Sequence, residues 1–452
     1  MKRWVMTGLL CMSLPAAAAV QQFMLDNGLQ VIVQEDHRAP IVVSQLWYRA
    51  GSMDEFNGTT GVAHMLEHMM FKGTQDVPEG QFSKLIAAAG GRENAFTNTD
   101  NTVYFEQLQK DQLGLALRLE ADRMHNLLLN DESFAKENKV VREERRMRTD
   151  DQPQALVYEN MMAVAFQSHP YRRPVIGWMN DIENMTVGDA REWYQRWYAP
   201  NNATLVVVGD VAADAVKALA TQYFAGIASK PLPIRKAQVE PTQVGIKRVN
   251  VKAPAKLPYV LMAYHVPVLR DAAQDTEAYA LEVLAGILDG SEAARLGRVL
   301  VREQRVASQA GASYDLVARG PGLFMLDGTP TQGKTVTDLE NALRAQVTTI
   351  IQAGVSADEL KRVKAQVIAN NVYQRDSTFY QAMQLGEYVS AGLPVTAVVD
   401  HVAKVQAVTA AQVQAVARKY LVDSGLTVAT LDPQPIGKQT TRAPVAGMRH
   451  LN

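Results

Sequence analysis

The chain has 452 residues, of which 47% are hydrophobic and 21% charged, and this composition excludes the disordered, collagen-like and coiled-coil classes for most of its length. The length predicts two or three domains. The 46 lysines and arginines balance 47 aspartates and glutamates, so no net basic charge favours nucleic acid, and the single cysteine excludes an internal disulfide or a cysteine-based zinc site.

The first residues have the pattern of a secretory signal peptide. Lys2 and Arg3 precede an apolar run at residues 4–14, and small residues ending at Ala19 follow. We expect cleavage after Ala19 and a periplasmic location for the mature protein. The apolar run is shorter than the ~20 residues that span a bilayer, and no later run is long enough, so the sequence predicts no stable membrane insertion.

Strands and helices alternate through residues 20–228, the predicted N-terminal domain. Asn27-Gly28 is a strong hairpin signal, and Gly90-Gly91 is typical of a helix end. The expected strands are a hairpin at residues 22–34, then 41–49, 93–98, 102–107 and 203–208. The expected helices are residues 60–71, 81–89, 110–128, 131–148 and 212–224.

Residues 229–244 are predicted to link this domain to a second one at residues 245–452, because prolines and charged residues gather there. The order of elements then partly repeats. The expected strands are residues 245–251, 259–265, 307–315, 322–327 and 426–430. The expected helices are residues 273–288, 293–302, 335–353, 357–390 with a break, and 410–420. This mixture predicts an α+β architecture used twice.

The expected helix at 60–71 carries the sequence His-Met-Leu-Glu-His at residues 64–68. His64 and His68 are four residues apart and share one helical face, where two imidazoles can bind one metal ion. Glu67 lies on the same face and can reach a water molecule there without being a ligand. The alternative is a pair of core histidines satisfied by hydrogen bonds. The metal site is favoured because the helix is apolar nearly all round, and unpaired buried polar groups are costly.

The pattern matches H-x-x-E-H, the inverse of the common zincin motif, and a catalytic zinc site needs a third protein ligand. The expected helix at 131–148 offers three candidates. Glu137 and Glu144 are seven residues apart and share a face with valines, whereas Glu143 is turned toward arginines. One glutamate of the shared face would be the ligand, and the other would orient a histidine. Spacing alone does not choose between them, and a surface helix rich in ion pairs is the alternative.

With these motifs the chain resembles the pitrilysin/insulysin family of inverse-zincin metallopeptidases, and within it the half-size bacterial members similar to the mitochondrial processing peptidase subunits. The resemblance covers nearly the whole mature chain. Its segments lie at residues 61–74, 90–104, 169–171, 176–177, 197–202 and 209–210. The family places a glutamate ligand downstream of the motif and an accessory glutamate seven residues before it. This implies that Glu144 is the ligand and Glu137 the accessory carboxylate.

The resemblance also implies a fold and an activity. The fold would be two α/β-roll domains, each a mixed sheet covered by helices, together forming one half of a clamshell. The activity would be zinc-dependent hydrolysis of peptide bonds, with Glu67 taking a proton from the attacking water. The strand near Asn94, Ala95, Phe96 and Thr97 resembles the family edge strand, which binds peptide by strand addition. An ordinary hairpin is the alternative for that strand.

In this family the second domain contributes an arginine and a tyrosine that hold the substrate. Arg302 fits the arginine, but Ser308 stands near the tyrosine position, and Tyr314 is out of register. We therefore expect either a homodimer or a heterodimer with a related subunit that supplies these residues. A noncatalytic scaffold or peptide-binding subunit is the alternative function, and a metal-dependent amidase acting on nonpeptide substrates is a weaker one.

Overall fold

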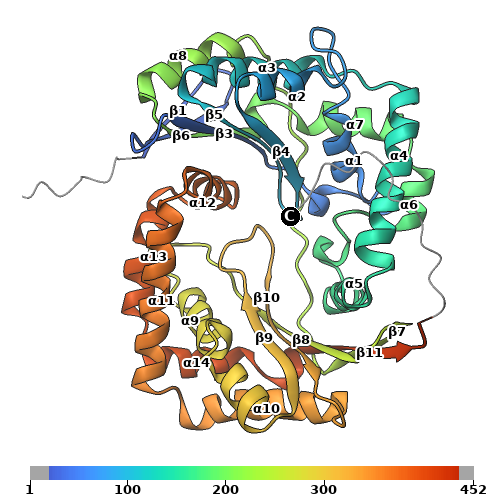
Figure 1. Cartoon of the computed structure of the whole chain (residues 1–452), viewed down its shortest axis with the longest axis vertical. Helices are drawn as coiled ribbons and strands as arrows, with labels where there is room; N and C mark the ends of the chain where they lie inside the picture. Colours follow the sequence, from blue (N-terminus) through green and yellow to red (C-terminus); the bar gives the residue numbers. More distant parts are fainter. Residues whose placement is uncertain (1–19, 437–452) are drawn as a thin grey trace, which may run out of the picture.

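The computed structural model describes residues 20–436, so the predicted signal peptide at residues 1–19 lies outside the described range. Within this range the chain forms two mixed sheets, and helices cover both (Figure 1). The first sheet belongs to the N-terminal half of the chain and the second to the C-terminal half. This arrangement confirms the predicted α+β fold.

The first sheet has the strand order β1-β2-β6-β3-β5-β4. Its strands are β1 (Gln21–Met24), β2 (Gln30–Glu35), β3 (Ile41–Tyr48), β4 (Arg92–Thr97), β5 (Thr102–Gln109) and β6 (Ala203–Gly209). Only β2 and β6 pair in parallel. The central strands β3 and β6 are buried along almost their whole length, as expected when both faces of a sheet are covered.

The second sheet repeats this topology. Its order is β7-β11-β8-β10-β9, in which β7 and β11 pair in parallel, as β2 and β6 do in the first sheet, and the other pairs are antiparallel. Its strands are β7 (Lys247–Pro254), β8 (Tyr259–Val266), β9 (Ala307–Tyr314), β10 (Gly322–Pro330) and β11 (Leu426–Gln434). This order corresponds to the order β2-β6-β3-β5-β4 of the first sheet, so β4 and β9 lie at equivalent edges of their sheets. Residues 225–246 between the halves form no helix or strand, and the predicted domain boundaries there stay a prediction.

Fourteen α-helices surround the sheets in the described part of the chain. In the N-terminal half they are α1 (Val62–Met69), α2 (Gln81–Ala88), α3 (Leu113–Asn126), α4 (Asp131–Arg145), α5 (Pro153–Ala165), α6 (Met179–Asn184), α7 (Val187–Trp197) and α8 (Ala213–Phe224). In the C-terminal half they are α9 (Glu277–Asp289), α10 (Val336–Ala353), α11 (Ala357–Arg375), α12 (Thr378–Ser390), α13 (Thr396–Ala407) and α14 (Ala410–Tyr420). Between residues 20 and 436, no helix is both long enough and apolar enough to cross a membrane.

Each half of the chain supplies one helix that packs on the sheet of the other half. Helix α5 of the first half packs on β7, β8 and β11, where Val157 and Met161 join the apolar core of the second sheet. Helix α12 of the second half packs on β3 and β6 (Figure 1). There Leu385 lies in one apolar cluster with Trp47. Each sheet is therefore buried by a helix from the other half.

A buried ionic cluster ties α3 to the first sheet. Arg123 donates to the carboxylate of Glu120 at 2.8 Å and lies 3.5 Å from Glu106. All three side chains are at most 1% exposed. The guanidinium also stacks over Tyr104 and Phe82, at 4.3 and 4.5 Å from the ring centroids. Burial raises the pKa of Glu106 well above its usual value.

We expect Arg123→Met to lower the free energy of unfolding by about 3–5 kcal/mol, because it leaves two buried carboxyl groups without their cation. Urea denaturation measures this change. Lys136→Met removes an exposed ion pair with Glu132 and serves as the control, with an expected change of at most about 1 kcal/mol. Equal effects of the two substitutions would contradict the prediction.

Candidate active site

Helix α1 is fixed at its start by close backbone packing. Gly61 precedes the helix with φ of 86°, and a Cβ atom there would lie 2.4 Å from the carbonyl oxygen of Ile176. Only glycine tolerates both constraints. The buried carboxylate of Glu55 accepts from the amides of Gly61 and Ala63 at 2.8 and 2.9 Å. These contacts fix the position and orientation of the helix that carries the H-x-x-E-H motif.

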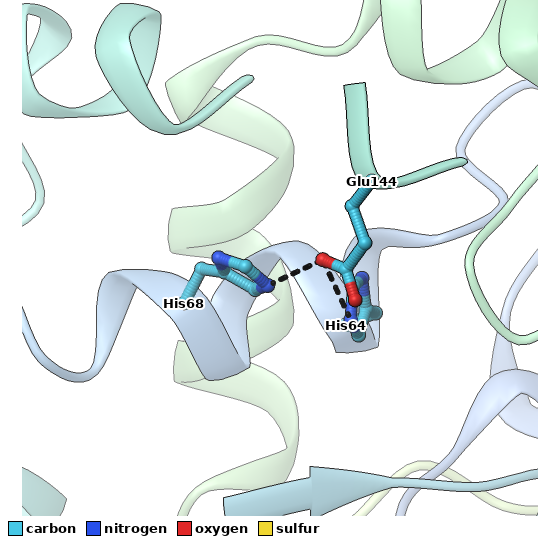
Figure 2. Close-up of side chains that lie close together, drawn as sticks. All are labelled: His64, His68 and Glu144. Atoms are coloured by element: carbon cyan, nitrogen blue, oxygen red, sulfur yellow. Dashed lines mark ion pairs between the residues drawn. The ribbon is translucent and has the colours of Figure 1, made fainter. Parts of the chain in front are cut away.

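Three side chains from two helices converge beside the first sheet. Figure 2 shows His64 and His68 on α1 facing the carboxylate of Glu144 on α4. Glu144 Oε2 lies 3.2 Å from His68 Nε2 and 3.8 Å from His64 Nε2. One donor atom from each residue lies within 4.8 Å of the others, and all three residues are buried. The structure thus brings together the three predicted metal ligands.

These residues fit a zinc ion. Nitrogen and oxygen ligands bind zinc at about 2.0–2.2 Å, so neighbouring donors of a tetrahedral site lie about 3.3 Å apart. The donor separations of 3.2 and 3.8 Å are close to that spacing. Two imidazoles and one carboxylate, with one position left for water or substrate, are also the donor set of catalytic zinc sites.

Glu137 lies on the other side of His68. Its Oε2 is 3.1 Å from His68 Nδ1, and its Oε1 is 2.5 Å from the ammonium group of Lys72. The two ring nitrogens of His68 therefore contact different carboxylates, Glu144 at Nε2 and Glu137 at Nδ1. A carboxylate in this position fixes the orientation and tautomer of a metal-binding histidine. Of the glutamates on α4, the remaining candidate Glu143 pairs instead with Arg146 at 3.0 Å.

The charges of this group shift its pKa values in opposite directions. Burial lowers the pKa of His68, but the hydrogen bonds to Glu137 and Glu144 outweigh it and raise the pKa to about 9. Burial raises the pKa of Glu144, but the hydrogen bond from His68 and the nearby positive charges lower it to about 2. Glu144 is therefore ionised over the whole neutral range, as a metal ligand must be.

The backbone changes just after Glu144. Helix α4 ends at Arg145 and continues as a π-helical turn at Arg146–Asp150. Single π-helical turns occur frequently at functional sites. The turn places the guanidinium of Arg148 at 2.9 Å from Glu144 Oε1. The buried Arg145 anchors the turn, because it donates to Glu159 and to the carbonyl of Gly177, each at 2.8 Å.

Glu67 faces the edge strand β4. It is 1% exposed, and Thr97 Oγ1 donates to its Oε2 at 2.5 Å. Burial raises the pKa of Glu67 to about 7. A carboxyl group with a pKa near the working pH can both accept and release a proton, which is the property of a general acid–base catalyst.

The predicted peptide-binding residues Asn94, Ala95 and Phe96 lie on β4, at the edge of the first sheet. The amide of Asn98 donates to the carbonyl of Asn101, which fixes the alternation of the antiparallel ladder. Hydrogen-bonded and non-hydrogen-bonded pairs alternate along the ladder, so the backbone N–H and C=O groups of Ala95 point away from β5. The Ala95 amide donates instead to the side-chain oxygen of Asn94 at 2.9 Å. An extended peptide could pair there, but the role of all three residues stays a prediction.

The residues of the second half that were considered for substrate binding are far from the histidine–glutamate group in the sequence. Arg302 lies on a π-helical segment, Gly297–Glu303, and donates to the carbonyl of Glu292. Ser308 lies on β9 and donates to the carbonyl of Thr329, while the Tyr314 hydroxyl donates to Pro267. The substrate-binding role of Arg302 stays a prediction.

The sequence analysis did not predict the contacts that three residues make with the site, namely Lys72, Thr97 and Arg148. Two of them had a spacing signal: Lys72 follows His68 by four residues, and Arg148 follows Glu144 by four. Thr97 had only the alternation of β4, which places its side chain on the same face as that of Ala95.

We expect Glu137→Gln to weaken zinc binding about 10- to 100-fold, because the hydrogen bond that orients His68 loses its charged acceptor. Competition with a fluorescent chelator measures this. At saturating zinc, activity should largely recover. Glu79→Gln, which removes the other carboxylate paired with Lys72, is the matched control and should leave zinc affinity unchanged. Equal zinc affinity in both variants would show that Glu137 does not support the ligand.

Two family profiles match the chain. The profile described as "Insulinase (Peptidase family M16)" matches residues 30–178, and "Peptidase M16 inactive domain" matches residues 184–367. The zinc protease PqqE of Helicobacter pylori is 30% identical over 90% of this chain and 92% of its own length. An uncharacterized zinc protease of Streptomyces coelicolor is 26% identical over 89% of this chain and 87% of its own.

Solved structures show the same fold. A protease from Helicobacter pylori superposes with a TM-score of 0.87 and 28% identity, over 92% of this chain and all of that one. The periplasmic protease PqqL from Escherichia coli superposes with a TM-score of 0.76 and 19% identity, over 97% of this chain and 52% of that one. At that identity, the second likeness concerns the fold alone.

Proposed function

The chain belongs to peptidase family M16, the insulinase family, and from this premise we propose that it is a zinc-dependent metalloendopeptidase of peptides or unfolded segments. Its relatives are named zinc proteases. The observation that carries the proposal is the convergence of His64, His68 and Glu144 within 4.8 Å of one another. Glu67 projects from the same helix as the histidines and is held at β4.

The proposed mechanism divides the work between the metal and the protein. When bound, zinc polarises the scissile carbonyl and makes water acidic enough to attack at neutral pH. Glu67 accepts a proton from the attacking water at its carboxylate and passes it to the leaving amine. Glu137 holds the ring of His68 in place through Nδ1. Arg148 neutralises part of the charge on Glu144.

The proposed substrate is an extended peptide that adds to the open edge of the first sheet. The alternation of β4 turns the backbone groups of Ala95 and Thr97 toward this edge. Main-chain pairing tolerates varied side chains, so we expect little sequence preference from this contact. The open edge is formed by β4, the strand that carries Thr97. Because Thr97 contacts Glu67, a peptide paired with β4 would pass next to the proposed base.

We further propose that the protein is exported to the periplasm and acts as a dimer. The pattern of residues 1–19 supports export. The serine at position 308 supports a requirement for a related subunit that supplies the tyrosine. Copurification from native extract tests this: a second, related polypeptide is expected, and a fully active homodimer without one would refute the heterodimer.

Mass spectrometry of products from a peptide library tests the activity. The mature chain, loaded with zinc, should cleave internal bonds and yield fragments with new termini on both sides. Zinc binding without cleavage would point to a missing subunit. Peptide binding with neither zinc nor cleavage would favour the alternative of a noncatalytic scaffold, although a protein with that role does not need the buried histidine–glutamate group.

A further inference from the structure

Thr97 contacts Glu67 directly. Its hydroxyl donates to Glu67 Oε2 at 2.5 Å. The terminal torsion of a glutamate side chain is broad, so a buried carboxylate without a strong donor samples a range of orientations. A β-branched threonine has restricted rotation at its first torsion and presents its hydroxyl in a defined direction.

The pleat of β4 directs this contact. Ala95 belongs to the core that includes α1, whereas Phe96 packs edge-on against Trp47 on the opposite face, with ring centroids 5.9 Å apart. Side chains alternate along a strand, so Thr97 shares the α1 face with Ala95. Helix α1 packs directly on β4, and this brings Glu67 to Thr97.

The turn that follows Thr97 is locked by the second half of the chain. The backbone amide of Arg319 donates to the carboxylate of Asp100 at 2.7 Å, and its guanidinium donates to the Asp100 carbonyl at 2.6 Å. The same guanidinium pairs with Asp54 at 2.9 Å, and the Tyr171 hydroxyl donates to Asp100 at 2.5 Å. Both the Arg319 and Asp54 side chains are 4% exposed. Thr97 therefore stands at the end of a strand whose turn is held on several sides.

From these contacts we propose that Thr97 is a positioning residue for the reaction: its hydroxyl holds the Glu67 carboxylate in the orientation that receives the proton of the attacking water. The proposal rests on the proposed peptidase function. The backbone of Thr97 points to the open edge of the sheet, where a substrate would pair, while its side chain points to Glu67. Thr97 thus fixes the position of the Glu67 carboxylate relative to a peptide paired with β4.

The test compares Thr97→Val with Thr97→Ser in the zinc-loaded protein. Valine has the same shape but no hydroxyl, so we expect kcat to fall about 10- to 100-fold, as for the loss of a hydrogen bond to a charged group, with KM nearly unchanged. Serine keeps the hydroxyl and should recover most of kcat. Both variants should bind one zinc and unfold at the wild-type midpoint. Thr97→Ala provides a second hydroxyl-free variant if valine disturbs folding.

Two controls separate positioning from a general effect on the hairpin. Thr102 faces Thr97 across the ladder, but its hydroxyl donates to the Ala50 carbonyl, so Thr102→Val should leave kcat near the wild-type value. In a Glu67→Gln background, Thr97→Val should cause no further loss, because the two residues act together.

The outcomes distinguish this inference from the proposed function. Absence of peptide cleavage by the zinc-loaded wild-type protein, both alone and together with the subunit that copurifies with it, would reject both. An active wild type with a fully active Thr97→Val variant would reject the inference alone. A loss of kcat that serine does not restore, or a loss equal to that of Thr102→Val, would also overturn it, since either result would assign Thr97 a structural role.

Discussion

Replacing Glu67 with glutamine is expected to reduce peptide hydrolysis about 100- to 10,000-fold, the usual contribution of a positioned general acid–base group. Glutamine keeps the size of the side chain and can still contact Thr97, but it cannot accept the proton of the attacking water. Zinc should remain bound, because Glu67 is not among the three converging ligands. The measurement is the initial rate of cleavage of a quenched peptide, together with the zinc content of the same sample.

The matched control for this variant is Glu183→Gln. Glu183 is a half-exposed carboxylate that pairs with Arg142 on the outer side of α4. Its replacement should change neither rate nor zinc content. A Glu67→Gln protein that keeps most of its activity would show that another group takes the proton. Loss of zinc together with activity would show instead that Glu67 supports the metal directly.

Removing one of the three ligands has the second largest expected effect. Structural zinc sites with four ligands bind with about 10–16 kcal/mol, so each ligand contributes roughly a 100-fold factor or more in affinity. His64→Ala or Glu144→Gln should therefore leave the purified protein without stoichiometric zinc and without measurable cleavage. Elemental analysis and the peptide assay measure these two quantities on one sample.

Glu143→Gln controls for the ligand variants, because Glu143 neighbours Glu144 in the sequence but pairs with Arg146. It should retain one zinc and full activity. Partial recovery of the His64→Ala activity at high zinc would agree with weakened binding. A His64→Ala protein with full zinc and full activity would contradict the assignment of the site.

The fold was predictable where apolar residues follow a clear period. The broken helix expected at residues 357–390 divides into α11 and α12 because Ser377 caps the second helix through the Tyr380 amide. Helices α5, α6, α7 and α13 were not predicted. Helix α5 lies between the two halves and contacts several elements, so it has no single apolar stripe. Helix α7 did carry a recognisable signal, the capping box of Thr186 and Asp189.

The site was predictable to the extent that its residues lie close in the sequence. His64, Glu67 and His68 share one helical face, and a period of seven places Glu137 and Glu144 together on another. The choice of Glu144 as a ligand needed either the family resemblance or the fold, which brings α4 against α1. The hydrogen bonds between Arg319 and Asp100 join residues that are 219 positions apart, and no local sequence pattern predicts such a contact.

The most direct test of zinc-dependent peptide hydrolysis at this site is a zinc titration of the metal-stripped mature protein with a quenched peptide as substrate. Activity should start near zero, rise in proportion to added zinc and reach its plateau at one zinc per chain, while Glu67→Gln binds the same amount of zinc without activity. Cleavage by the stripped protein, or an equal rate in the Glu67→Gln variant, would contradict the assignment.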